Sequence, residues 1–88
     1  MTDEDLIEET HRIHTRQEFA VFLQELLSDF EKHSDEWENV TISDFISGMI
    51  GFSYSAEGYY MNIGADVDCD VPQWRVFADI LLAGRVHG

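Results

Sequence analysis

The sequence predicts a mainly α-helical fold: one small domain of three to four helices, with a long acidic loop before the last helix. Three observations lead to this prediction. Apolar residues recur at helical spacing in separate segments, and helix start signals precede those segments. At 88 residues, the chain is long enough for one hydrophobic core and too short for two. We therefore expect residues 1–88 to form a single domain.

The N-terminal segment is polar and acidic. Its apolar anchors are Leu6, Ile7 and Ile13. So few anchors leave two arrangements open, because a helix packs on a core through a continuous apolar face. We expect either a short helix over Glu4–His11 or a loosely packed arm over residues 1–14.

The clearest predicted element is a helix over Arg16–Lys32. Thr15 and Glu18 form a capping box, in which each side chain accepts a hydrogen bond from the backbone N–H of the other residue. The apolar residues that follow have the spacing of one helical face. They are Phe19, Phe22, Leu23, Leu26, Leu27 and Phe30.

A second helix is predicted to start at Thr41, because Asp44 follows three residues later. Its apolar stripe consists of Phe45, Ile46, Met49, Ile50 and Tyr54. Gly48 and Gly51 weaken it, since each costs about 1 kcal/mol relative to Ala in a helix interior. The two glycines indicate either a close approach by a neighbouring helix or simply a poor helix.

Residues 55–72 combine turn-forming residues with Tyr59 and Tyr60. We predict that this segment is a long connecting loop and that at least one of the two tyrosines is exposed. A loop of this length in a small domain is often functional.

The last predicted helix covers Val71–Ala83. Asp70 is its expected N-cap, and Pro72 would lie in the first turn, where a missing N–H costs least. Gly84 is a typical stop signal. The apolar stripe is broad and predicts a central position in the core. It comprises Trp74, Phe77, Ala78, Leu81 and Leu82.

Charge is the strongest compositional signal. The chain has 18 Asp and Glu against 5 Lys and Arg, a formal net charge of -13. Between His33 and Trp74 there is no Lys or Arg at all. This argues against direct nucleic-acid binding and against an anionic membrane, because both need basic residues. A basic protein is the expected partner; the alternative is that the charge only keeps the protein soluble.

Two groups of residues are the candidate contacts for such a partner. Acidic side chains steer a basic protein, and tyrosines are common at the centres of interfaces. The first group is Asp66, Asp68, Asp70, Glu57, Tyr59 and Tyr60. The second group is Asp35, Glu36 and Glu38.

No motif predicts catalysis or a cofactor, so we expect that the protein is not an enzyme. P-loop, GxGxxG and GxSxG patterns are missing from the sequence. The run from Asp66 to Asp70 resembles the start of an EF-hand loop, but Val71 and Phe77 occupy the positions that need Gly and Glu. Cys69 stands among aspartates, which disfavour its reactive thiolate.

The pair His11 and His14 has the spacing of two metal ligands but lacks a third and fourth. A metal site built from these histidines and the aspartates is therefore a third, weaker interpretation, and we expect no metal.

The sequence also predicts a cytoplasmic protein. The single cysteine, Cys69, allows no internal disulfide. The N-terminus lacks the basic and apolar regions of a signal peptide, and no apolar run approaches the roughly 20 residues that cross a bilayer.

Three sequence blocks carry a resemblance to a known family. They are Trp37-Glu38-Asn39 followed by Thr41, then Gly58-Tyr59-Tyr60 with Asn62 and Gly64, then Trp74 with Phe77-Ala78-Asp79 and Leu81. The pattern resembles a small bacterial family of unknown function over roughly Phe19 to Leu82. The resemblance implies a shared fold and supplies no catalytic residues.

In type, the short acidic chain is also similar to the immunity proteins of contact-dependent growth inhibition. This resemblance implies an inhibitor that binds a basic toxin domain, with a nuclease as the expected class, in a 1:1 complex. The acidic surface would cover the toxin sterically and electrostatically. The alternative function is a general interaction or regulatory adaptor whose acidity serves solubility.

Overall fold

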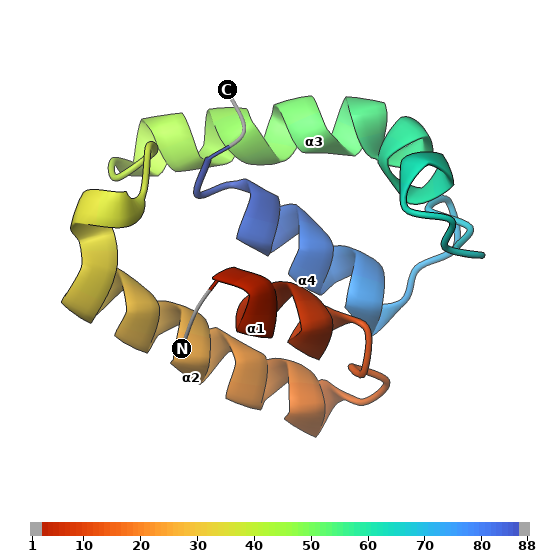
Figure 1. The fold of residues 1–88 in the computed structure, drawn as a ribbon, viewed down its shortest axis with the longest axis horizontal. Coiled ribbons are helices and arrows are strands. Elements are labelled where there is room, and N and C mark those ends of the chain that lie inside the picture. Colours follow the sequence, from red (N-terminus) through yellow and green to blue (C-terminus); the bar gives the residue numbers. More distant parts are fainter. Residues whose placement is uncertain (1–2, 87–88) are drawn as a thin grey trace.

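The computed structural model describes residues 3–86, and this part of the chain is a small helical bundle without strands. Its elements are α1 (Asp3–Thr10), α2 (Arg16–His33), the short 3-10 helix η1 (Ser34–Glu36), α3 (Ile42–Asn62) and α4 (Trp74–Ala83). Figure 1 shows α2 and α3 on opposite sides of the molecule, with α4 between them and α1 beside α4 and α2. The predicted mainly α fold is confirmed.

Helix α4 is the centre of the bundle. Its backbone approaches α1, α2 and α3, whereas among the described helices the backbone of α3 approaches only α4. Val76 and Ala78 are both buried, and residues two apart in a helix point in nearly opposite directions. Val76 packs in the cluster with α3, and Ala78 packs in the cluster with α1 and α2. The predicted central position of the last helix is confirmed.

The buried apolar residues form two clusters on the two sides of α4. The first joins α1, α2 and α4 and consists of Leu6, Ile13, Phe22, Leu26, Ala78 and Leu82. The second joins α3 to α4 and consists of Phe52, Ala56, Tyr60 and Val76. Because Leu6 is fully buried, α1 is a packed helix and not a loose arm.

The predicted start signals of α2 and α3 are both confirmed. The backbone N–H of Glu18 donates to Thr15 Oγ1 over 3.1 Å, and the N–H of Thr15 donates to Glu18 Oε1 over 3.1 Å. A further N–H bond from His14 is the main cause that lowers the pKa of Glu18 below its usual value. At the start of α3, the N–H of Asp44 donates to Thr41 Oγ1 over 3.1 Å.

The predicted loop over residues 55–72 is wrong in its first half, because α3 continues to Asn62. Phe52, Ala56 and Tyr60 follow one another at intervals of four residues and are buried against α4. This burial outweighs the helix-weakening effect of the glycines, as tertiary packing commonly overrides local propensity. Gly64, with φ of 69°, lies just beyond the end of α3.

The predicted start of the last helix is also wrong: α4 begins at Trp74, with Gln73 as N-cap, and Pro72 precedes the helix. Asp70 does not cap α4. Instead its N–H donates to Asp68 Oδ1 over 3.0 Å, which is a local turn of the kind that aspartate favours.

Gly84 ends α4 as predicted, and the structure adds a reason for glycine there. A Cβ at this position would lie 3.0 Å from side-chain atoms of Met49 and of Phe45. The end of α4 therefore approaches α3 as closely as a residue without a side chain allows.

Candidate functional site

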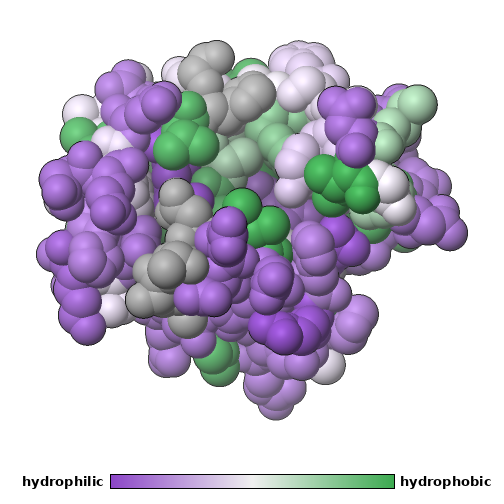
Figure 2. Space-filling model, in the orientation of Figure 1, coloured by the Kyte–Doolittle hydropathy of each residue, from purple (hydrophilic) through white to green (hydrophobic). Residues whose placement is uncertain are grey.

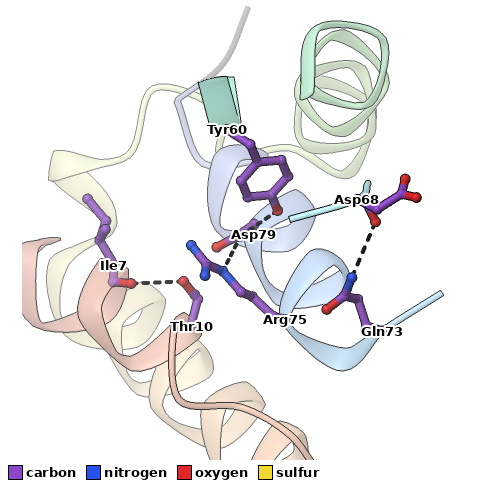
Figure 3. Close-up of polar contacts among 7 residues, drawn as sticks. All are labelled: Ile7, Thr10, Tyr60, Asp68, Gln73, Arg75 and Asp79. Carbon is purple, nitrogen blue, oxygen red and sulfur yellow. Dashed lines mark hydrogen bonds and ion pairs between the residues drawn. The ribbon is translucent and has the colours of Figure 1, made fainter. Parts of the chain in front are cut away.

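The aspartates of the first candidate group lie in the loop after α3 and point to solvent. Asp66, Asp68 and Asp70 are exposed. They alternate with half-buried residues that pack against the second cluster, Ala65, Val67 and Cys69. Successive side chains of an extended segment point in opposite directions, so this alternation turns all three carboxylates outward. Gln73 fixes the loop, because its amide donates to the backbone oxygen of Asp68 over 3.2 Å (Figure 3).

The second candidate group lies at the opposite end of α3. Asp35 and Glu36 belong to η1, Glu38 follows it, and all three are exposed. Helix α3 has 21 residues and spans about 31 Å at 1.5 Å per residue. The structure therefore does not bring the two acidic groups together; it places them at the two ends of one long helix (Figure 1).

Tyr59 and Tyr60 lie in the last turns of α3, not in a loop, and neither is exposed. Tyr60 is only 2% exposed, and its hydroxyl donates to Asp79 Oδ2 over 2.6 Å (Figure 3). Burial is the main cause that raises the pKa of both tyrosines above the usual value. In this conformation Tyr60 is not available to a partner, whereas Glu57, one turn earlier, is exposed.

Four residues of the three sequence blocks, Trp37, Asn39, Tyr60 and Asp79, form contacts that join elements of the fold. Tyr60 and Asp79 join α3 to α4, and Arg75 Nε lies 3.5 Å from the same carboxylate oxygen. On the other side, Trp37 Nε1 donates to Asp29 Oδ2 over 2.7 Å. Asn39 donates through its side chain to the backbone oxygen of Gly84 over 3.0 Å. These contacts hold the elements of the bundle together.

The basic residues are distributed unevenly over the described surface. Arg75 and Arg85 are turned inward, and they form ion pairs with Asp79 and Asp29. The exposed basic residues of the range 3–86 lie on α2 or just before it: Arg12, Arg16 and Lys32. No exposed Lys or Arg therefore lies on η1, α3 or the loop after α3. The sequence showed a stretch without basic residues, and the structure adds that its nearest arginines are internally paired.

Sequence reasoning missed the exposed apolar side of α3. The predicted core stripe included Ile46, Ile50 and Tyr54, but their exposed fractions are 48%, 53% and 90%. We call these residues, with Ile42 at 77%, the outer face of α3. The four lie at intervals of four residues and form a single stripe. In Figure 2 the surface over α2 is mostly hydrophilic, and more hydrophobic residues are visible in the upper part, where α3 lies.

An open groove of about 540 Å³ runs along the outer face. It is lined by Ile46, Met49, Ile50, Ser53, Tyr54 and, from α4, Ile80. Periodicity could not have identified it, because α3 carries apolar residues on both faces and either face could have been the buried one.

A second cavity, of about 480 Å³, lies between α1 and α2 and is lined mainly by acidic residues. Within it, burial is the main cause that raises the pKa of Glu9 to about 7, and a hydrogen bond with Glu25 and the charge of Glu25 raise it further. The protonation of Glu9 is therefore coupled to the packing of α1 on α2.

The structure gives no support to a metal site within residues 3–86. No three His, Cys, Asp or Glu side chains of this range are placed to hold one ion. His11 and His14 are both exposed. Among the described helices, none is both long and apolar enough to cross a bilayer.

The comparison with known proteins identifies a family and nothing beyond it. Residues 15–87 match the family described as a family of unknown function (DUF7660), so the chain belongs to this family. The match confirms the sequence resemblance to a small family of unknown function. No curated protein and no solved structure matches the chain.

Proposed function

We propose that this member of the family is a protein-binding module whose partner is a basic protein. The observation that carries the proposal is the distribution of charge. The part of the surface from η1 to the loop after α3 exposes acidic residues and no Lys or Arg, and its nearest arginine, Arg75, is paired internally with Asp79. A surface with one sign of charge attracts the opposite sign, so it steers a basic partner and repels acidic ones.

The loop after α3 is the part of this surface that we assign as the first contact. Lys32 lies three residues before Asp35, so the second acidic group has a positive neighbour. Asp66, Asp68 and Asp70 have no exposed positive neighbour in the loop. The C-terminal end of α3 adds to the negative potential there, because the last carbonyl groups of a helix carry partial negative charge.

The specific form of the proposal is an immunity protein that binds a basic toxin domain in a 1:1 complex and blocks it. A nuclease is the toxin class that this form favours, because an enzyme that binds phosphates has a positive surface around its active site. The acidic surface supports this form; the choice of a toxin rather than another basic partner comes from the resemblance in type.

The test is to co-express the chain with the product of the neighbouring gene and to measure association rates of the purified pair at increasing salt. We expect a 1:1 complex whose association slows steeply with salt, because the encounter is steered by charge. The variant Asp66→Lys with Asp70→Lys should slow association by at least about tenfold. The matched control, Glu4→Lys with Glu31→Lys, changes the net charge equally at exposed positions on the other side.

Equal slowing by the two double variants would show that only net charge matters and would contradict the assignment of the loop. Association that neither double variant changes would favour the adaptor, whose acidity serves solubility. For the immunity form, the chain should also restore growth to cells that express the neighbouring gene. Binding without restored growth would contradict an immunity role, but it would still support a basic partner.

A further inference from the structure

The outer face of α3 consists of apolar side chains that remain exposed in the described fold. Asp44 and Glu57 are the only charged residues in the 21 residues of α3. Besides its exposed serines, the helix carries apolar residues on two faces, and an apolar face is normally buried. Here the inner side is filled by the second cluster, but Ile42, Ile46, Ile50 and Tyr54 remain at least 48% exposed. Contiguous exposed apolar surface with a polar rim is typical of a protein interaction site.

The shape of this surface indicates the kind of group that it can accept. The groove is formed between α3 and Ile80 of α4, and its lining includes Met49, an adaptable side chain. Grooves of this kind accept apolar side chains that recur every three or four residues along a helix. The stripe from Ile42 to Tyr54 covers 12 residue steps, or about 18 Å, which is enough for several such contacts.

The charges at the two ends complete the description. Along the chain, exposed acidic residues precede the stripe at Glu36 and Glu38 and follow it at Glu57, Asp66 and Asp70. A partner that covers the apolar stripe therefore meets carboxylates at both ends. A partner complementary to this surface therefore has one apolar side and positive charges toward both of its ends.

We propose that the outer face of α3 binds an amphipathic, basic helix of the partner protein. The apolar side of that helix packs along Ile46, Ile50 and Tyr54, and its Lys and Arg side chains reach the carboxylates at the ends of α3. This inference rests on the proposed function, because it identifies the surface and the structural class of the same basic partner.

A second copy of the chain fits this surface less well than a basic helix. Both ends of α3 are acidic, and no Lys or Arg lies between His33 and Trp74 to neutralise them. In parallel or antiparallel pairing, acidic ends would meet acidic ends. An anionic membrane is disfavoured by the same charges.

The experiment uses the full chain and three synthetic 20-residue peptides. The first has Leu along one helical face and Lys elsewhere; the second has the same composition in scrambled order; in the third, Glu replaces Lys. Affinities are measured by fluorescence anisotropy, and the contact surface is mapped by amide NMR shifts. We expect the first peptide to bind most tightly and to shift the amides of residues 42–61.

A matched pair of variants tests the apolar contact separately from charge. Ile46→Gln with Ile50→Gln should weaken the first peptide by at least about tenfold, because each buried aliphatic side chain contributes strongly to affinity. The control is Leu27→Gln, which removes a side chain of α2 that is 59% exposed and should leave the affinity unchanged.

Each remaining outcome overturns a definite part of the account. If the scrambled peptide binds as tightly as the amphipathic one, the proposal of an apolar docking surface is contradicted. The proposal of a basic partner is then retained. If neither basic peptide binds even at low salt, the basic partner itself is wrong. If ultracentrifugation shows dimers that form through the α3 amides, a second copy covers the outer face and the inference fails.

Discussion

Helices α2 and α3 are the two long helices of this chain, and they meet the solvent in opposite ways. Helix α2 is amphipathic: its buried side carries Phe22 and Leu26, and its outer side carries charges of both signs, including Arg16 and Lys32. Helix α3 is apolar on its inner and its outer side and exposes no positive charge. The outer side of α2 is suited to water, and the outer side of α3 is suited to a partner.

This difference shows that burial and apolar character are separate pieces of information. In α2 they coincide in part: Phe22 and Leu26 of the predicted face are buried, whereas Leu23 and Leu27 of the same face are exposed. In α3 they do not, because Phe52 and Ile50 are both apolar and only the first is buried. The following variants test whether the two helices differ as described, in order of decreasing expected effect.

The largest effects are expected for the buried aromatic anchors of the two helices. Phe22→Ala in α2 and Phe52→Ala in α3 should each lower the free energy of unfolding by about 3–4 kcal/mol, because each leaves a cavity in a cluster. Urea denaturation measures the change, with Leu27→Ala as an exposed control that should cost less than about 1 kcal/mol. A mild effect of Phe52→Ala would mean that α3 is not held by its inner side.

The next largest effect is expected at the hydrogen bond that joins α3 to α4. Tyr60→Phe leaves Asp79, a buried carboxylate, without its 2.6 Å donor. Unfolding should become easier by about 2 kcal/mol, since a hydrogen bond to a charged group contributes about 1.5–3 kcal/mol and, among the described residues, only the 3.5 Å ion pair with Arg75 remains. The matched control Tyr54→Phe removes a hydroxyl from a side chain that is 90% exposed, and its melting temperature should not change. Equal stability of the two variants would contradict this assignment.

A smaller, pH-dependent effect is expected between α1 and α2. The pKa of Glu9 is raised from 4.5 to about 7, mainly by burial, so the folded state binds this proton more tightly than the unfolded state. Its contribution is therefore fully favourable below pH 4.5 and is lost as the pH rises through 7.

Glu9→Gln should consequently stabilise the protein at pH 8, by about 1 kcal/mol after allowance for screening by solvent, and have little effect at pH 4.5. Denaturation curves at the two pH values measure this difference. Glu8→Gln, at an exposed neighbouring position, changes the net charge equally and controls for general repulsion. An equal gain in stability at pH 8 for both variants would show that general charge repulsion, and not the burial of Glu9, causes the effect.

The smallest effect is expected on the outer face of α3. Ile46→Gln with Ile50→Gln should change the free energy of unfolding by less than about 0.5 kcal/mol, because both side chains are already half-exposed. A midpoint shift in urea is the measurement. A loss of 2 kcal/mol or more would mean that these residues belong to the core, and the contrast with α2 would disappear.

Much of the fold could be predicted because its local signals are strong. The caps at Thr15 and Thr41 and the single apolar side of α2 identify helices without tertiary information. The second half of α3 could not be predicted, because glycines and serines weaken its local signal and its stability comes from burial on α4. The start of α4 was missed because Asp68 forms a turn that precedes the helix.

The candidate site was predictable in part. The alternation of Asp66, Asp68 and Asp70 with less polar residues is visible in the sequence, and these aspartates are exposed. The burial of Tyr60 was not predictable, since it depends on Asp79, 19 residues away. The outer face of α3 also required the structure, because only the position of α4 decides which apolar side of α3 is covered.

The central claim is that a basic partner binds on the α3 side of the molecule. Hydrogen–deuterium exchange of the full chain, with and without the basic amphipathic peptide or the co-purified partner, tests it most directly. The account predicts slower exchange in residues 42–61 and in the acidic loop that follows, with α2 unchanged. Protection confined to residues 16–33 would contradict it.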